Sequence, residues 1–175
     1  VEVVFASDIS YTRNDWYTGM AYDEVLSMDP AHVRLERMQS GAPLCDNHNR
    51  FGRTLDCVFG VVEEVRLEGS QMVGVIRFSK RATAEEIFQD VIDGILRNFS
   101  IGYRVYAYDR EAATETKIET RTAVSWEPFE LSITPVPADY TAQVRTQNKN
   151  LVNPQNQPTV MDEDILTRFN SRRTN

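Results

Sequence analysis

"AEEIFQDVIDGILRNFSIGYRV", residues 84–105, changes its hydrophobic period partway along. Ile87, Val91 and Ile95 recur every four residues, which is typical of the buried face of a helix. The second half alternates instead, which predicts a strand with Ser100 and Gly102 on the same face. The stretch therefore predicts a helix that leads directly into a core strand.

The residues at the two ends of this helix support the same prediction. Thr83 and Glu86 have the T-x-x-E spacing of a capping box, in which each side chain satisfies an unpaired backbone N–H. Acidic residues fill the first turn and Arg97 stands at the end, and both charges interact favourably with the helix dipole. We expect this helix to be the main one of the fold.

Most of the other patterns before residue 140 predict strands. Two apolar runs, residues 56–69 and 70–79, predict a hairpin that turns at Gly69. Residues 1–8 and 110–136 predict further strands, whereas residues 19–28 and 30–38 are short helical candidates. The sequence therefore predicts a mainly β fold with helices, of the α+β class.

The composition changes after Asp139. Residues 140–160 are rich in Asn, Gln, Thr and Pro, which predicts a flexible linker with little to bury. Residues 161–175 begin with acids and end with arginines, which suits a short helix or a disordered tail. We therefore expect a main domain over residues 1–139, followed by this linker and tail.

Charge and composition exclude several classes of protein. The 175 residues carry a net charge of −7, which argues against a nucleic-acid-binding surface. No apolar run is long enough to cross a bilayer and no signal-peptide pattern is present, so no membrane association is expected. Cys45 and Cys57 are too few for a disulfide framework and predict free intracellular thiols. The first residue, Val1, indicates a trimmed N-terminus or a fragment.

One hydroxyl and one imidazole could form a nucleophilic pair. Ser100 lies where a β-branched residue would serve a strand better, so it is either a small filler or a nucleophile. His48, in "CDNHNRFG", could be its base, although a lone histidine is more often structural. Glu130 lies on an apolar strand, where it could orient the imidazole or simply face solvent.

Other catalytic templates fit less well. The sequence has no G-x-S-x-G elbow, no H-E-x-x-H, no Cys/His cluster and no phosphate-binding G-x-x-x-x-G-K-[ST] loop. No metal and no cofactor are therefore expected. Cys45 lies three residues before His48 and is an alternative nucleophile, but spacing alone does not establish a catalytic pair. Adjacent acids such as Glu85 and Glu86 are better explained as solvated surface.

Three ordered blocks resemble a known family, the prohead (capsid maturation) serine proteases of tailed bacteriophages. "GAPLCDNHNRFG" (41–52) is similar to the block that ends in the family's catalytic histidine. "VIRFSKRATAEEIFQDVIDGILRNFSIGYRV" (75–105) is similar to the strand, helix and nucleophile block. "WEPFELSITPVPAD" (126–139) is similar to the closing block, with its Glu-Xaa-Ser motif.

The resemblance implies a catalytic role for Ser100 as nucleophile, His48 as general base and Glu130 as the third member. Glu127 and Asp109 are nearby alternatives for the acid. Many relatives have an acid directly after the histidine, where this chain has an asparagine at residue 49, and Asp46 could take that place. Gly102 could leave room for the substrate backbone.

The resemblance also implies a fold and a setting. The family is similar in fold to the herpesvirus assembly proteases, which implies an antiparallel β-barrel wrapped by helices and makes a homodimer an expected partner state. The implied activity is a serine endopeptidase that cleaves capsid and scaffold precursors, and its own tail, inside the immature capsid in the host cytoplasm. The alternative is a catalytically silent assembly module of the same fold.

Overall fold

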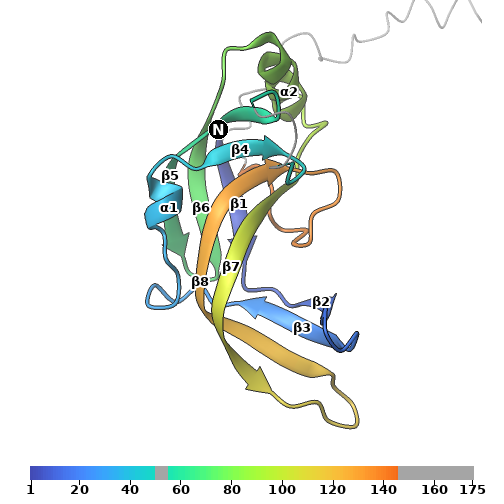
Figure 1. Ribbon diagram of the computed structural model, residues 1–175. Helices are drawn as coiled ribbons and strands as arrows, with labels where there is room; N and C mark the ends of the chain where they lie inside the picture. Colours follow the sequence, from blue (N-terminus) through green and yellow to red (C-terminus); the bar gives the residue numbers. More distant parts are fainter. Residues whose placement is uncertain (50–54, 146–175) are drawn as a thin grey trace, which may run out of the picture.

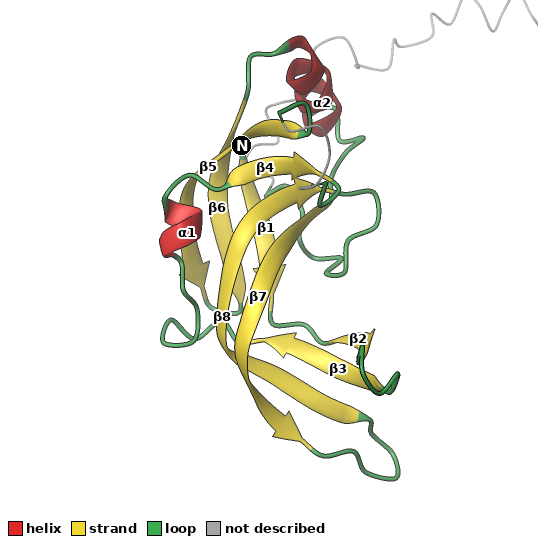
Figure 2. Ribbon diagram, in the orientation of Figure 1, coloured by secondary structure: helices red, strands yellow, loops and turns green. Residues whose placement is uncertain are grey.

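The computed structural model describes residues 1–49 and 55–145 of the chain, so most of the predicted linker and the whole predicted tail lie outside the described residues. Strands dominate (Figure 2). The elements are, in chain order, β1 (Glu2–Ser7), β2 (Tyr11–Asn14), β3 (Ala21–Leu26), α1 (Glu36–Gln39), β4 (Pro43–Asp46), β5 (Val58–Glu68), β6 (Gln71–Phe78), α2 (Ala82–Ile92), β7 (Phe99–Glu111) and β8 (Glu119–Ile133).

All of these strands belong to one curved sheet in the order β1-β6-β5-β4-β8-β3-β2, with β7 paired to β8 (Figure 1). The long β7–β8 hairpin is its axis, because β8 pairs with β4 near one end and with β3 near the other. Both of these neighbours run parallel to β8. The prediction of an antiparallel sheet is therefore wrong at these two pairs, and the mixed sheet is open along its named strands, so the predicted barrel is not confirmed.

The gap between β1 and β7 is bridged at one end by residues 142–145. The Ala142 carbonyl accepts a hydrogen bond from Phe99 N, while the Gln143 carbonyl accepts one from Val4 N. Ala142 is fully buried. Residues 142–145, which the sequence assigns to the linker, therefore pack onto the sheet.

The core lies on the concave side of the sheet and beneath the two helices. Trp126 is fully buried, packs edge-on against the ring of Tyr103, and donates its indole N–H to the Ser27 carbonyl at 2.9 Å. α1 contacts β5 and β8, and α2 contacts β5 and β6. The largest fully buried side chains are Trp126, Phe5, Phe99, Met38, Leu44, Met72, Ile76 and Leu131.

The main helix is confirmed but its ends are not. Arg81 is the N-cap residue and no side chain caps the helix, so the predicted Thr83–Glu86 capping box is wrong, since Thr83 lies inside the first turn. The helix ends at Ile92, because Gly94 adopts a left-handed φ of 72° that reverses the chain. Ile95, predicted on the buried face, is 71% exposed.

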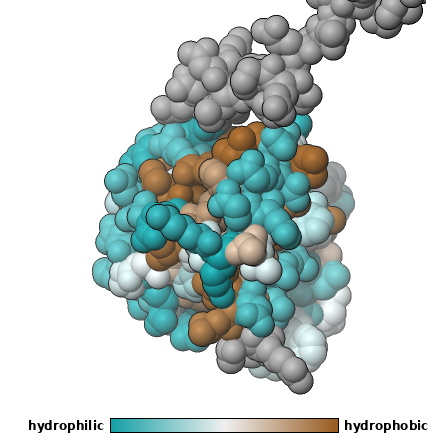
Figure 3. All heavy atoms as spheres, turned by 90° about the horizontal axis from the view of Figure 1, so that it is seen from above, coloured by the Kyte–Doolittle hydropathy of each residue, from teal (hydrophilic) through white to brown (hydrophobic). Residues whose placement is uncertain are grey.

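The early segments differ more from the expectation. Residues 21–26, inside the first helical candidate, form β3 because they pair with β2 and with β8. Of the second candidate only the single turn of α1 is helical. Seen from the end that carries α2, polar and apolar side chains are interspersed on the surface (Figure 3). In the described ranges, no helix combines the length and apolar character needed to cross a membrane.

Candidate active site

A strained turn after β4 presents His48 to the end of β8. Asn47 and His48 both have positive φ, 42° and 60°, a region that side chains disfavour. The turn is held by hydrogen bonds to the end of β8 and the residue after it: Asn47 N donates to the Ile133 carbonyl at 2.9 Å, and Thr134 Oγ1 donates to Asn47 Oδ1 at 2.8 Å. Several hydrogen bonds therefore hold His48 in a backbone conformation that is unfavourable by itself, as is common at functional sites.

The imidazole is bound to a buried carboxylate. His48 Nδ1 lies 2.6 Å from Glu130 Oε1, and Glu130 is only 3% exposed. An ionised carboxylate only accepts hydrogen bonds, so Nδ1 carries the proton and Nε2 of the neutral ring keeps a lone pair. The second carboxylate oxygen, Oε2, accepts a hydrogen bond from Ser132 Oγ at 2.7 Å. Both oxygens of Glu130 are thus engaged.

The space for the Glu130 side chain comes from a glycine. Gly102 lies directly opposite Glu130 in the β7–β8 ladder. A Cβ atom at residue 102 would lie 2.8 Å from Glu130 Cδ and Cγ, and closer still to Oε1. The room that we expected Gly102 to leave for a substrate is therefore occupied by the carboxylate.

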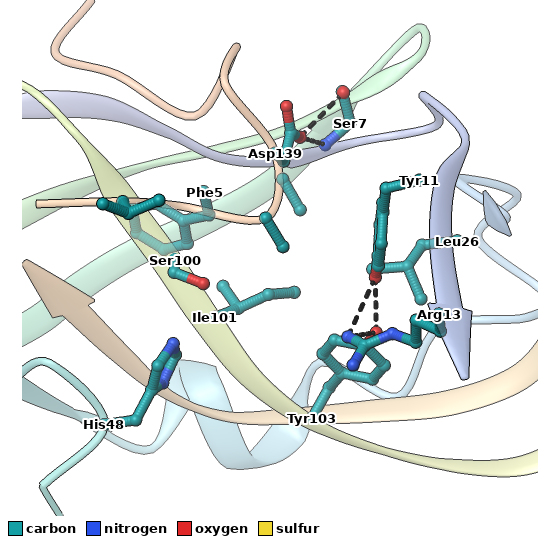
Figure 4. A pocket seen from close by; sticks show the side chains of 13 residues that line it. Phe5, Ser7, Tyr11, Arg13, Leu26, His48, Ser100, Ile101, Tyr103 and Asp139 are labelled. Atoms are coloured by element: carbon teal, nitrogen blue, oxygen red, sulfur yellow. Dashed lines mark hydrogen bonds between the residues drawn. The ribbon is translucent and has the colours of Figure 1, made fainter. Parts of the chain in front are cut away.

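Ser100 and His48 line the same cavity. Ser100 pairs with Ser132 across the ladder and is half-buried. The cavity has a volume of about 250 Å³, and Phe5, Leu26 and Ile101 form part of its wall. Figure 4 shows the His48 ring and the Ser100 hydroxyl directed into this space. Within residues 1–49 and 55–145 no hydrogen bond joins the two side chains, which is common in substrate-free sites.

The other candidate acids lie elsewhere. Glu127 accepts a hydrogen bond from Tyr106 Oη at 2.9 Å. This bond, and to a smaller extent the Arg37 guanidinium, holds the pKa of the Glu127 carboxyl below its usual value. Asp109 is exposed on β7, nine residues after Ser100. Asp46 is exposed at the end of β4. Among these acids the structure brings Glu130 to His48.

The alternative nucleophile and the second histidine have other surroundings. Cys45 is buried on β4, and burial, followed by the charge of Glu130, raises its pKa to about 11. At neutral pH it is therefore a thiol, which is a weak nucleophile. The ring of His32 lies 2.8 Å from Ser27 Oγ through Nδ1, beside the core. Within the described ranges, no group of three His, Cys, Asp or Glu side chains could hold a metal ion.

A buried polar cluster beside the cavity was not predicted. Glu24 is 2% exposed and accepts hydrogen bonds from Tyr11 at 3.1 Å, from Tyr108 at 2.5 Å and from Tyr103. Arg13 neutralises it through an ion pair of 2.5 Å. Tyr103 and Arg13 also line the cavity (Figure 4). No pattern in residues 11–24 predicts this polar cluster, because Glu24 and its four partners come together only once β2, β3 and β7 are in place.

Some backbone groups of β7 next to Ser100 point away from β8. Thr134 N donates to the Asn98 carbonyl, whereas Phe99 N donates outward to Ala142. Since backbone groups alternate in direction along an antiparallel ladder, those of Ile101 point away from β8 like those of Phe99. Among the described residues, no named strand pairs with β7 on that side, although residues 142 and 143 bond to its start. Ile101, directly after Ser100, therefore has backbone groups that β8 does not use.

Comparison with known proteins gives the family of this chain. The family of caudovirus prohead serine proteases matches residues 39–157, more than half of the chain. The chain therefore belongs to this family, and the predicted resemblance is confirmed. A major capsid protein of Halomonas phage phiHAP-1 is 41% identical over 135 residues, which are 77% of this chain and 21% of that protein. The chain thus spans about a fifth of this relative's length. No solved structure matches the chain significantly, so the likeness to herpesvirus proteases stays a prediction.

Proposed function

We propose that the chain is a serine endopeptidase in which Ser100 is the nucleophile, His48 the general base and Glu130 the residue that orients the base. The observation that carries the proposal is the 2.6 Å contact of His48 Nδ1 with a buried carboxylate, beside a cavity that also contains Ser100. Such an arrangement fixes the imidazole tautomer and stabilises its charged form.

The proposed reaction follows from these positions. His48 Nε2 takes the proton of Ser100 Oγ as the oxygen bonds to the carbonyl carbon of the scissile peptide. The C–N bond then breaks, and the leaving amine takes the proton from His48. A water molecule then attacks the ester while His48 takes its proton; the bond from the carbonyl carbon to Ser100 Oγ breaks, and His48 returns the proton to that oxygen, so the acid leaves and the serine is restored. Glu130 accepts the Nδ1–H throughout and offsets the positive charge of the ring.

The substrate class follows from the cavity edge and the family. An extended, exposed peptide can pair with the backbone of Ile101, so unfolded linkers suit the site better than folded segments. We propose that the substrates are capsid and scaffold precursors, and the chain's own continuation, inside the immature capsid in the host cytoplasm. A homodimer is part of the same expectation.

The competing function is a catalytically silent assembly module, which the relationship to a major capsid protein favours. A silent module needs the core and the sheet but not a reactive Ser100. The two functions therefore differ in the chemistry of one hydroxyl.

The test is covalent labelling of the full 175-residue chain with a fluorophosphonate probe, in which Ser100 Oγ would displace fluoride from phosphorus. We expect one label on wild type, mapped by mass spectrometry to the peptide that contains Ser100, and none on Ser100→Ala or His48→Ala. Ser125→Ala, which removes a hydroxyl of β8 that does not line the cavity, is the matched control and should label normally.

The second arm measures the intact mass of purified wild type and of Ser100→Ala over time. Loss of a tail from wild type alone supports self-cleavage. A folded wild type that is never labelled and never processed favours the silent module. Processing that continues in Ser100→Ala rejects Ser100 as the nucleophile.

A further inference from the structure

Ser132 is fully buried and its hydroxyl touches two parts of the candidate site at once. Ser132 Oγ accepts a hydrogen bond from the backbone N–H of His48 at 2.9 Å and donates one to Glu130 Oε2 at 2.7 Å. Together with the His48–Glu130 contact, these bonds form a closed ring. The hydroxyl therefore has its donor and its acceptor roles both used inside the site.

The ring restricts the two groups that must meet. Glu130 Oε2 is tied to Ser132 while Oε1 faces His48 Nδ1, so the plane of the carboxylate is fixed by its two oxygens. The absent side chain of Gly102 gives the carboxylate its place against β7. On the other side, the N–H of His48 anchors a residue with φ of 60°, where the backbone is otherwise unfavourable.

Strand geometry explains why a serine two residues after the acid can do this. Residues i and i+2 of a strand share a face, so Glu130 and Ser132 both point toward the turn that carries His48. Ser132 also lies opposite Ser100 in the ladder. The hydroxyl does not line the cavity and is fully buried, so it cannot itself contact a substrate.

We propose that Ser132 is a positioning residue, which holds the carboxylate of Glu130 in the plane of the imidazole and locks the backbone of His48 beneath it. Its effect on catalysis rests on the proposed peptidase function. Without the hydroxyl, Glu130 Oε2 and the His48 N–H each lose a buried partner, and the carboxylate is free to rotate away from Nδ1.

If the role of Ser132 were merely structural, its hydroxyl would only anchor the turn that carries His48. A neighbouring residue allows this anchoring role to be tested separately. Thr134 is buried directly after the end of β8, and its hydroxyl holds the same turn through Asn47 Oδ1. In the described part of the chain, its hydroxyl bonds to Asn47 Oδ1 and the Val136 carbonyl, and no hydrogen bond joins it to Glu130 or His48. Thr134→Ala therefore removes an anchor of the turn and leaves the carboxylate ring intact.

The experiment compares Ser132→Ala with Thr134→Ala in the full chain. For Ser132→Ala we expect the maximal rate constant of fluorophosphonate labelling to fall about 10- to 100-fold, the effect of one hydrogen bond to a charged group. The half-saturating probe concentration should stay unchanged. In Thr134→Ala the labelling rate constant should fall at most a few-fold, even if the melting temperature falls as much as in Ser132→Ala. An equal loss in both variants would overturn the proposal in favour of simple anchoring.

A spectroscopic measurement separates this inference from the proposed function. In protein labelled with ¹⁵N-histidine, the Nδ1 proton of His48 should appear far downfield because it is bound to a carboxylate. His32→Gln assigns it, since the chain has two histidines. Ser132→Ala should weaken or shift this signal whether or not the chain is active, and Thr134→Ala should not. An unchanged Nδ1 proton signal in Ser132→Ala rejects the positioning role. A wild-type chain that does not react with the fluorophosphonate probe rejects only the peptidase function.

The variants are checked for folding by thermal unfolding first. Should Ser132→Ala fail to fold, Ser132→Cys takes its place, because a thiol of similar size is a weaker donor. A partial loss of labelling rate and a shifted His48 signal are then expected. Wild-type values for both in Ser132→Cys would contradict the proposal.

Discussion

Gly102 and Glu130 face each other across the β7–β8 ladder, and the carboxylate occupies the space that a side chain on residue 102 would need. The position of the acid beside His48 thus depends on the absence of a Cβ on the neighbouring strand. This relationship links a backbone position to the orientation of the imidazole.

Gly102→Ala is expected to displace the carboxylate, because the new Cβ would lie 2.8 Å from Glu130 Cδ. A misplacement of about 1 Å at a catalytic group costs roughly 100-fold, so we predict a fall of that size in the fluorophosphonate labelling rate. Gly60→Ala is the control, since its Cβ would collide with the backbone of residues 77 and 78, away from the cavity. Normal labelling of Gly102→Ala would show that Glu130 does not depend on this space.

Cys45 is expected to be inert at neutral pH, because burial first and then Glu130 raise its pKa to about 11. In folded protein, thiol-specific reagents should modify Cys45 at least about tenfold more slowly than in urea-unfolded protein, in which the thiol titrates near 8.5. The mass of the modified peptide reports the rate. Cys45→Ala should keep the fluorophosphonate label. Loss of the label in a folded Cys45→Ala would instead support a cysteine nucleophile.

The cluster around Glu24 predicts an alkaline limit to stability. Burial, followed by the charge of Glu24, raises the pKa of Tyr11 to about 12, and burial raises the pKa of Tyr103 and Tyr108 further. In the unfolded chain these phenols ionise near 10. Because the folded state holds its protons longer, their contribution is complete below pH 10 and declines as the pH rises above 10 toward the folded-state values.

Tyrosine absorbance at 295 nm measures this effect. The folded chain should ionise fewer of its seven tyrosines near pH 11 than the unfolded chain does. The urea midpoint should fall over the same range. Identical titration curves for folded and unfolded protein would contradict the buried, hydrogen-bonded cluster.

Trp126 is expected to contribute to the core more than any exposed aromatic. It is fully buried and bonded to the Ser27 carbonyl, so Trp126→Ala should lower the free energy of unfolding by about 3–5 kcal/mol. Trp126→Phe keeps most of the ring and should cost less. Trp16, which is 92% exposed, is the matched control, and Trp16→Ala should leave the urea midpoint nearly unchanged.

The elements that the sequence predicted well are those with local signals. The β5–β6 hairpin turns at Gly69, whose φ is 58°, and the apolar alternation of its strands is visible in the sequence. β3 was predicted as helical because its residues have no local strand signal. Its strand state comes from pairing with β2 and β8, and β8 lies about a hundred residues away.

The candidate site also combines residues with a sequence signal and residues placed by long-range strand pairing. Ser100, His48 and Glu130 were proposed from ordered blocks, and the structure brings the second and third into contact. The places of Gly102 and Ser132 depend on the register of β7 against β8, which no single strand reveals. The Glu-Xaa-Ser spacing was the one available signal, since alternate strand residues share a face.

The pairing of residues 142–145 with both β1 and the start of β7 has a kinetic consequence. The Ala142 carbonyl accepts a hydrogen bond from Phe99 N, so a residue only three positions before Arg145 is fixed beside the proposed nucleophile. Tethering replaces bulk concentration with an effective concentration set by the length of the tether. Removal of the chain's own continuation would then be a first-order process, with a half-time that does not change on dilution.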